Sequence, residues 1–199
     1  MPRSEVKKKM EKILLTLALV CTGQVTHADW KQWRGPTGQG HTDAKLPTEW
    51  SETKNVKWRT PIPGKGWSSP VIEGNQIWMT TAFETPATKE ETAERLKKNT
   101  GGVPVNVLSS VRLHVVWVDK RTGKLLHSLK VITKKQPQWV HKLNSYASPS
   151  PIIESGRVYC HFGSYGTVCI DAKTAKVAWR NEKLWVNHEN GPGSTPVLW

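Results

Sequence analysis

Short apolar runs separated by turn residues occupy the stretch 145–180 of the chain. The runs are rich in β-branched and aromatic residues, and the gaps hold Gly, Ser or Asp, which is the pattern of β-strands. The connections are too short for parallel crossovers, so an antiparallel meander is predicted. The second and third runs show little polar alternation, which is typical of a sheet covered on both faces. The four expected strands are 150–153, 157–162, 167–170 and 176–180.

The same unit recurs earlier in the chain. Residues 69–80 match 150–160 nearly position for position, and 116–124 match 168–176. A third copy begins at 194–197 (Ser-Thr-Pro-Val), about 45 residues after the second, and this period with four strands per copy predicts blades of a β-propeller. One four-stranded meander cannot bury two apolar faces alone, whereas stacked blades can.

The sequence therefore predicts an all-β fold, a partial propeller of about two four-stranded antiparallel blades plus pieces. Blades are expected at about 69–131 and 150–180, with a third beginning near 194, in an incomplete propeller domain 55–199. Residues 56–59 match the fourth strand of a blade and are interpreted as a closing strand that awaits its partners. Because two blades cannot close a ring, we expect the chain to be the N-terminal fragment of a longer protein.

The first blade carries an insertion, expected at 82–110. Thr88 followed three residues later by Glu91 is a capping-box pattern, so a short exposed helix is predicted over about 89–98. Few of its residues are apolar, so it should pack weakly. Two interpretations are open: a lid or partner-binding flap on one mouth of the propeller, or a tolerated surface insertion.

Residues 1–28 have the pattern of a secretory signal peptide. They contain a basic head, an apolar run at 13–20 that is too short to span a bilayer, and small residues before Asp29. Residues 29–54 show neither a helical nor a strand period and are expected to form an N-terminal arm. These features predict a periplasmic or secreted protein with no transmembrane segment in the mature chain.

The net charge of the 199-residue chain is +13, of which residues 1–28 carry +3, so +10 remains after the predicted signal peptide. A nucleic-acid footprint would cluster these charges on one face with aromatic partners. Here Lys and Arg are scattered, often beside predicted turns. The pattern indicates a solvated surface and argues against a nucleic-acid partner.

The turns between the third and fourth strands of the blades have a clear physical basis. Asp119 and Asp171 each stand three residues before a threonine, Thr122 and Thr174. An Asp at this position accepts backbone N–H bonds as in an Asx turn, and Gly123 supplies a residue that readily takes positive φ. The aspartates are therefore predicted to form turns rather than to bind metal.

These turns belong to a pattern, Ala-x-Asp-x-x-Thr-Gly-Lys-x-x-Trp, which resembles the tryptophan-docking motif of the quinoprotein-type (PQQ-like) β-propeller family. The resemblance covers about residues 50–199. It implies that Trp179 and Trp58 are docking residues that pack on the turn of a neighbouring blade. The positions that depart from the family pattern are His127 in place of Trp, Cys169 in place of Ala and Ala175 in place of Gly.

The family includes quinoprotein dehydrogenases and the outer-membrane-assembly propeller lipoprotein, so the resemblance leaves two functions open. The favoured one is a non-catalytic scaffold that binds protein partners of the cell envelope, with peripheral association at the outer membrane and no cofactor. The alternative is a PQQ- and calcium-dependent dehydrogenase whose active-site residues lie in further C-terminal blades. The resemblance implies that such an enzyme holds PQQ between a Trp and two adjacent cysteines, and this sequence has no adjacent cysteine pair.

Cys160 and Cys169 fall on the second and third strands of the second blade. If the hairpin turns at Ser164-Tyr165, the two cysteines face each other within disulfide reach. One hypothesis is a cross-strand disulfide, which an oxidising compartment permits. The other is a pair of small buried thiols.

Two further groups of residues are weak candidates for ligand contacts. The cluster 188–190 (His-Glu-Asn) is the most ligand-like stretch, although an ordinary loop is the favoured interpretation. Trp67, Trp139 and Trp185 lie in connections between blades. One of them could stack on a flat ligand, but capping a blade edge is favoured.

Overall fold

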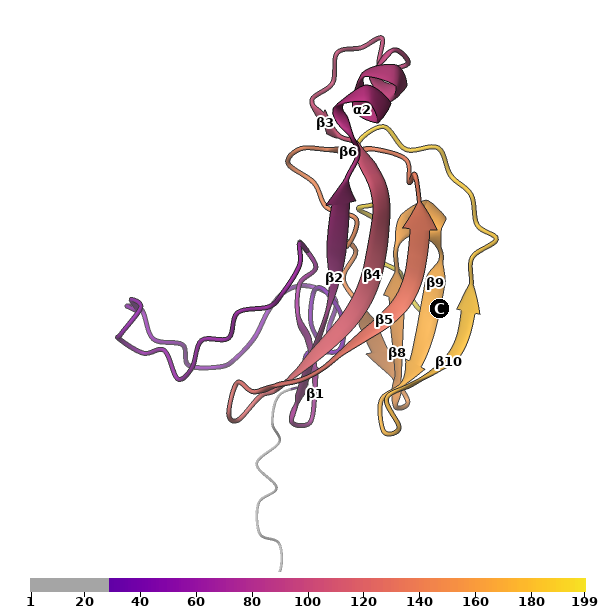
Figure 1. Ribbon diagram of the computed structural model, residues 1–199. Coiled ribbons are helices and arrows are strands. Elements are labelled where there is room, and N and C mark those ends of the chain that lie inside the picture. The colour runs from indigo at the N-terminus through magenta and orange to yellow at the C-terminus, as the bar shows by residue number, and fades with distance from the viewer. Residues whose placement is uncertain (1–28) are drawn as a thin grey trace, which may run out of the picture.

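The computed structural model describes residues 29–199, and the predicted signal peptide 1–28 lies outside the described residues. Antiparallel strands dominate, in two four-stranded sheets that stand side by side in Figure 1. Each sheet is a meander in which neighbours in sequence are neighbours in space. The prediction of an all-β partial propeller with a helix inserted in its first blade is confirmed.

The first blade pairs its strands in the order β1-β2-β4-β5. The β2 and β4 strands run antiparallel from Gln76 opposite Asp119 to Pro86 opposite Leu108. A bulge falls between Thr85 and Pro86, where proline removes a ladder donor. The strands are β1 (Val71–Glu73), β2 (Gln76–Pro86), β4 (Leu108–Asp119) and β5 (Leu125–Lys135).

The insertion in the first blade is shorter than the predicted 82–110, because β2 and β4 continue to pair past the expected strand ends. Ala82 pairs with Leu113 and Phe83 with Arg112, so only residues 87–107 lie outside the four-stranded sheet. Ladder hydrogen bonds satisfy the backbone of residues 82–86 and 108–110, although their sequence lacks a clean apolar alternation.

The inserted helix is α2 (Lys89–Leu96), and Thr88 is its N-cap. The Thr88 hydroxyl oxygen accepts the backbone N–H of Glu91 at 3.1 Å, which satisfies one of the free donors of the first turn. No residue of α2 is buried. A two-residue ladder between β3 (Val105–Asn106) and β6 (Val140–His141), absent from the predictions, ties the insertion to the connection between the blades.

The second blade follows the order β7-β8-β9-β10. Its hairpin between β8 and β9 contains a short 3₁₀ turn, η1 (Gly163–Tyr165). A bulge between Val177 and Trp179 places these two side chains on opposite faces of β10. The strands are β7 (Ile152–Glu154), β8 (Arg157–His161), β9 (Thr167–Asp171) and β10 (Lys176–Asn181).

The core lies between the two sheets. Trp78 and Trp117 stack with ring centroids 4.4 Å apart, and they share one buried cluster with Phe162 and Ile170 of the second blade. Burying a large apolar side chain stabilises the folded chain by roughly 1.5–3 kcal/mol. The inner face that one meander could not cover is therefore covered by its neighbour.

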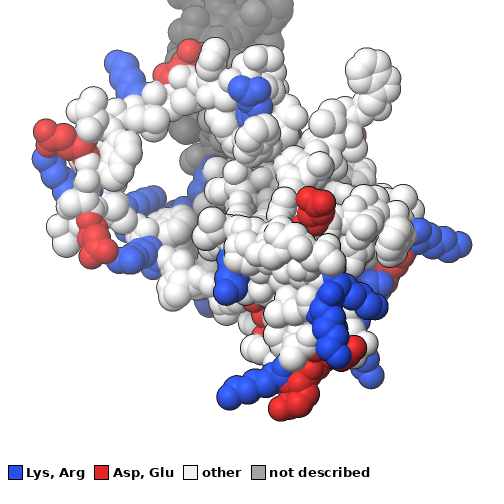
Figure 2. Space-filling model, turned by 90° about the horizontal axis from the view of Figure 1, so that it is seen from above, with Lys and Arg blue, Asp and Glu red and all other residues white. Residues whose placement is uncertain are grey.

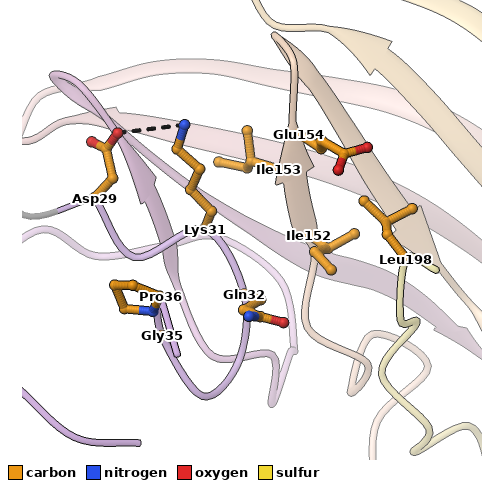
Figure 3. Close-up of a pocket in the computed structure, with 9 residues that line it drawn as sticks. All are labelled: Asp29, Lys31, Gln32, Gly35, Pro36, Ile152, Ile153, Glu154 and Leu198. Carbon is orange, nitrogen blue, oxygen red and sulfur yellow. Dashed lines mark ion pairs between the residues drawn. The ribbon is translucent and has the colours of Figure 1, made fainter. Parts of the chain in front are cut away.

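The N-terminal segment pairs with both blades. Trp30 forms a β-bridge with Ile72 of β1, and Lys31 accepts the backbone N–H of Ile153 of β7 at 2.8 Å. Figure 3 shows Asp29, Lys31, Ile152, Ile153 and Leu198 around a pocket between the N-terminal segment and β7. The volume of this cavity is about 360 Å³. The first residues of the expected arm thus protect the edges of the inner strands.

The rest of the arm differs from the sequence-based expectation. Residues 41–57 are exposed and extend away from the blades (Figure 1). The predicted closing strand at 56–59 is not a strand, because no strand of the described residues pairs with it. The next stretch returns to the first blade, where Lys65 bridges Ala82 of β2.

Candidate functional site

Trp58 lies on the turn between β4 and β5 of the first blade. Its indole N–H donates to the carbonyl oxygen of Lys120 at 2.9 Å, and the hydroxyl of Thr60 donates to the carbonyl of Gly123. Gly123 has a φ of 76°, and a Cβ built on it would lie 2.5 Å from the Trp58 ring. The glycine therefore supplies a left-handed residue and also the space that the indole fills.

Two aspartates close equivalent turns in the blades. Asp119 Oδ1 accepts the backbone N–H of Thr122 at 2.7 Å and its hydroxyl at 2.8 Å. Asp171 Oδ1 accepts the same two groups of Thr174 at 2.8 and 2.9 Å. These hydrogen bonds favour the ionised carboxylates and hold the pKa of both below the usual value, with Thr122 and Thr174 as the main donors. Ala175 keeps a left-handed φ of 59° in the second turn.

Trp179 lies on the face of the second blade that is turned away from the first. In the sheet Trp179 pairs with Cys169 of β9. The neighbours of Cys169 on that strand, Val168 and Ile170, point to the opposite face and belong to the core. The ring centroid of Trp179 is 6.1 Å from that of Tyr159, and 47% of Trp179 is exposed. His127, at the equivalent position of the first blade, stacks on Trp117 at 4.5 Å within its own sheet.

The hypothesis of a Cys160–Cys169 disulfide is wrong. Cys160 pairs with Val168, and Cys169 pairs with Tyr159. The loop 162–166 is one residue longer than the register of the sequence analysis assumed. Since neighbouring residues of a strand point to opposite faces, the two thiols lie on opposite faces of the sheet. Both are free and buried, and burial raises the pKa of each thiol.

A groove of about 350 Å³ lies between helix α2, the segment 136–139 and the loop 187–189. Figure 1 shows α2 and the C-terminal loop at the same end of the two blades. The lining is basic, amide-rich and aromatic, a combination that suits hydrogen bonding to a polar chain. The lining residues are Arg95, Lys98, Gln136, Gln138, Trp139, Asn187, His188 and Glu189.

Arg95 fixes one wall of this groove. Its guanidinium donates to the carbonyl of Leu108 at 2.8 Å and to the carbonyl of Pro137. It also pairs with Glu91, one helical turn earlier, at 3.5 Å. Gln136 donates to the same carboxylate at 3.2 Å. A helix of this length without buried residues is not stable alone, so these bonds hold it in place.

His188 lies at the opposite wall. Its backbone N–H donates to Gln138 Oε1 at 3.2 Å, and its Nε2 lies 3.3 Å from the hydroxyl of Tyr165. Burial lowers the pKa of His188, so the imidazole is neutral near pH 7. The carbonyl of Gln138 accepts hydroxyls from Tyr165 at 3.1 Å and Tyr146 at 2.7 Å. The wall is therefore a hydrogen-bonded unit rather than a loose loop.

The described residues, 29–199, show neither a strongly charged face in Figure 2 nor a helix that could span a membrane. Basic and acidic side chains are interspersed over the face drawn in Figure 2, without a broad surface of one sign. Within these residues no helix is both long enough and apolar enough to cross a bilayer.

Comparison with protein families gives one match. Residues 41–198 match the sequence profile of the PQQ-repeat family described as "Outer membrane protein assembly factor BamB". The chain belongs to this family. No curated protein matches the chain significantly. The match spans both blades, the docked Trp58 and residues 194–197, where a third repeat is predicted to begin.

The residues described here do not fit PQQ or its calcium ion. The two cysteines of the second blade lie on opposite faces of the sheet, so they cannot form the flat sulfur pair that the resemblance implies. Over residues 29–199 no group of three or more His, Cys, Asp or Glu side chains could hold a metal ion.

Sequence reasoning missed the residues that build the groove. Arg95 stands four residues after Glu91, a spacing that predicts only a surface ion pair, whereas its main acceptors are backbone carbonyls of β4 and of the connection after β5. Such contacts join segments far apart in the chain and leave no periodic pattern. One missed feature did carry a signal: a hydroxyl residue stands immediately before the proline of each repeat, at 69, 150 and 195.

Proposed function

We propose that this protein is a non-catalytic extracytoplasmic propeller that binds a protein partner of the cell envelope through the groove beside helix α2. The proposal includes peripheral association with the outer membrane, no cofactor in this chain and no nucleic-acid partner. Its family, described by the name of an outer membrane assembly factor, supports this class of function.

The observation that carries the proposal is the fixed position of an otherwise unsupported helix. No residue of α2 is buried, so the helix adds nothing to the core. The Arg95 guanidinium nevertheless donates to the carbonyls of Leu108 and Pro137. These two hydrogen bonds hold α2 against the blade and keep the groove open. Rigid scaffolds that position exposed loops and insertions in this way are typical of binding surfaces.

The chemistry of the groove favours a polypeptide as the ligand. The Asn187 amide and the amide oxygen of Gln136 line the groove and can pair with a peptide backbone. The Gln138 amide is engaged within the wall, by the N–H of His188 and the carbonyl of Val186. Apolar side chains continue the surface beside the groove, where Trp185 is 74% exposed and Val186 is 58% exposed. A partner segment with a polar backbone and apolar side chains would use both.

Retention of envelope proteins on the immobilised protein tests the proposal. Arg95→Ala removes the anchor of α2 and should reduce retention of the specific partner at least tenfold. Arg59→Ala is the matched control, because Arg59 is exposed, lines neither wall of the groove and pairs with Glu52 of the arm. Equal retention by both variants would contradict the role of the groove.

The alternative, a quinoprotein dehydrogenase, has a separate test. Titration of the protein with PQQ and Ca²⁺, followed by calorimetry, should give no saturable heat if the scaffold proposal is right. Stoichiometric binding with dye reduction in the presence of an alcohol or aldose would establish the enzyme instead.

A further inference from the structure

A second cavity, of about 650 Å³, shares no residue with the groove beside α2. Three parts of the chain enclose it: the N-terminal segment around Trp33, the first residues of both blades, and the start of the third repeat at 193–197. Its volume lies within the usual range of ligand-binding clefts.

Two tryptophans with open faces line this cavity. Trp33 is 54% exposed and Trp67 is 56% exposed. Trp67 is held at its edge, since its indole N–H donates to the carbonyl of Leu143 at 3.0 Å and its backbone N–H to Ala147 at 3.1 Å. An indole fixed at its edge can present a ring face to a ligand, and a large rigid face binds a flat apolar surface at low entropic cost.

Each tryptophan carries a cation. The guanidinium carbon of Arg34 lies 5.6 Å from the ring centroid of Trp33, and the ammonium of Lys65 lies 5.9 Å from that of Trp67. The residues that line the cavity include Arg34 and no acidic side chain. The local charge therefore favours a ligand that carries negative charge.

Hydroxyl-bearing residues make up half of the remaining lining. The backbone N–H of Ser69 donates to Ser150 Oγ at 2.8 Å, and the backbone N–H of Ser150 donates to Thr195 Oγ1 at 3.2 Å. These two hydrogen bonds hold the backbones of Ser69 and Ser150 in place. The amide of Gln32 adds a further donor and acceptor. Fixed hydroxyls and an amide around aromatic faces suit a ligand that is itself rich in hydroxyls. The hydroxyl residues are Ser69, Ser148, Ser150, Ser194 and Thr195.

We propose that this cavity binds a segment of an acidic polysaccharide, whose sugar rings stack on Trp33 and Trp67 while a uronate carboxylate pairs with Arg34. The aromatic faces suit the C–H faces of sugar rings, the hydroxyls suit the hydroxyls of the sugar, and Arg34 suits the carboxylate. This inference goes beyond the proposed protein partner and is independent of it, because the two sites share no lining residue.

Isothermal titration of the protein with alginate hexasaccharide tests the site, with cellohexaose as the neutral probe and a proline-rich decapeptide as the competing class. Alginate should bind with at least tenfold higher affinity than cellohexaose, and the affinity should fall as salt rises. Trp33→Ala or Trp67→Ala should weaken binding about tenfold. Trp50→Ala, which removes an indole that is 65% exposed on the N-terminal arm and outside the cavity, should leave binding unchanged.

Arg34→Gln is a second variant, for the case that a tryptophan variant fails to fold. Arg34 is exposed on a loop, so its replacement should not disturb the fold. Arg34→Gln should abolish the preference for alginate over cellohexaose, whereas Arg59→Gln should keep that preference. No binding of alginate, equal binding of both sugars by the wild-type protein, or tighter binding of the peptide would each overturn the inference.

Discussion

Ser69 donates its backbone N–H to the hydroxyl oxygen of Ser150 at 2.8 Å, although 81 positions separate the two residues. Ser150 in turn donates its own N–H to the hydroxyl of Thr195 at 3.2 Å. Each of these residues directly precedes the proline that begins a repeat. The hydroxyl of one repeat therefore satisfies a backbone donor of the repeat before it, and this relay joins the blades at their first strands.

Ser150→Ala should destabilise the protein through this relay. Ser150 is 3% exposed and its bond with Ser69 is partly buried, so the N–H of Ser69 would lose its acceptor in a partly buried position, at a cost of about 1–2 kcal/mol in the free energy of unfolding. Urea denaturation measures the loss. Ser150→Thr keeps the oxygen and should lose less than about 1 kcal/mol. An alanine variant as stable as the threonine variant would show that the relay contributes nothing.

Gly123→Ala should displace Trp58 from the first blade. The new Cβ would lie 2.5 Å from the indole, whereas a Cβ at Gly74 meets nothing within 4 Å. Both glycines have positive φ, 76° and 57°, so Gly74→Ala reports the backbone strain alone, about 1–2 kcal/mol. The Gly123 variant should lose about 1–3 kcal/mol more from overpacking, measured by denaturation. Equal losses would mean that the indole does not dock on this turn in solution.

The two thiols of the second blade should be found reduced. Alkylation of the unfolded, unreduced protein followed by mass spectrometry should label both Cys160 and Cys169. In the native protein, labelling at pH 8 should be slow, because burial raises the pKa of both thiols. Since the native state holds these protons more tightly than the unfolded chain, stability should fall as pH rises above about 9. If neither cysteine of the unfolded protein is labelled, the two are joined by a disulfide and the free-thiol account is wrong.

Acidification should destabilise the protein through its half-buried histidines. Burial lowers the pKa of His114, His161 and His188, and Arg112 adds to the effect at His114. The unfolded chain therefore binds protons below about pH 6.5 that the native state does not, so stability present above that pH is lost as pH falls through the native pKa values.

The variant His114→Gln tests this linkage. The free energy of unfolding should fall less steeply between pH 7 and 5 in this variant than in the wild type, as followed by urea denaturation at each pH. His41→Gln, in the exposed arm, should leave the slope unchanged. A slope identical in all three proteins would exclude a contribution from His114.

The repeats made the blades predictable, and single-residue details decided the rest. Strands such as β8 and β9 could be read from apolar runs between turn residues, but their register depended on whether the loop began at Phe162 or Gly163. Gly163 and Gly166 both take positive φ, 60° and 127°, and no pattern in the sequence distinguishes a four-residue loop from the observed turn. The one additional loop residue shifts the register of β8 against β9, so Cys160 and Cys169 lie on opposite faces of the sheet.

The candidate site was less predictable than the fold for a physical reason. The groove depends on contacts such as Arg95 with Pro137 and Gln138 with His188, which join separate segments through backbone groups. Every residue carries a backbone carbonyl, so the residue types do not predict which carbonyls will accept these hydrogen bonds. The helix itself was predicted because Thr88 and Glu91 form a local capping pattern, confined to one turn.

Site-specific photocrosslinking tests the central claim, that the groove beside α2 binds an envelope protein, most directly. A photoreactive amino acid at Lys98, which lines the groove, should give one defined adduct with an envelope protein. The same group at Lys173, exposed in the turn between β9 and β10, should give none. No adduct at position 98, or the same adduct from both positions, would contradict a binding role for the groove.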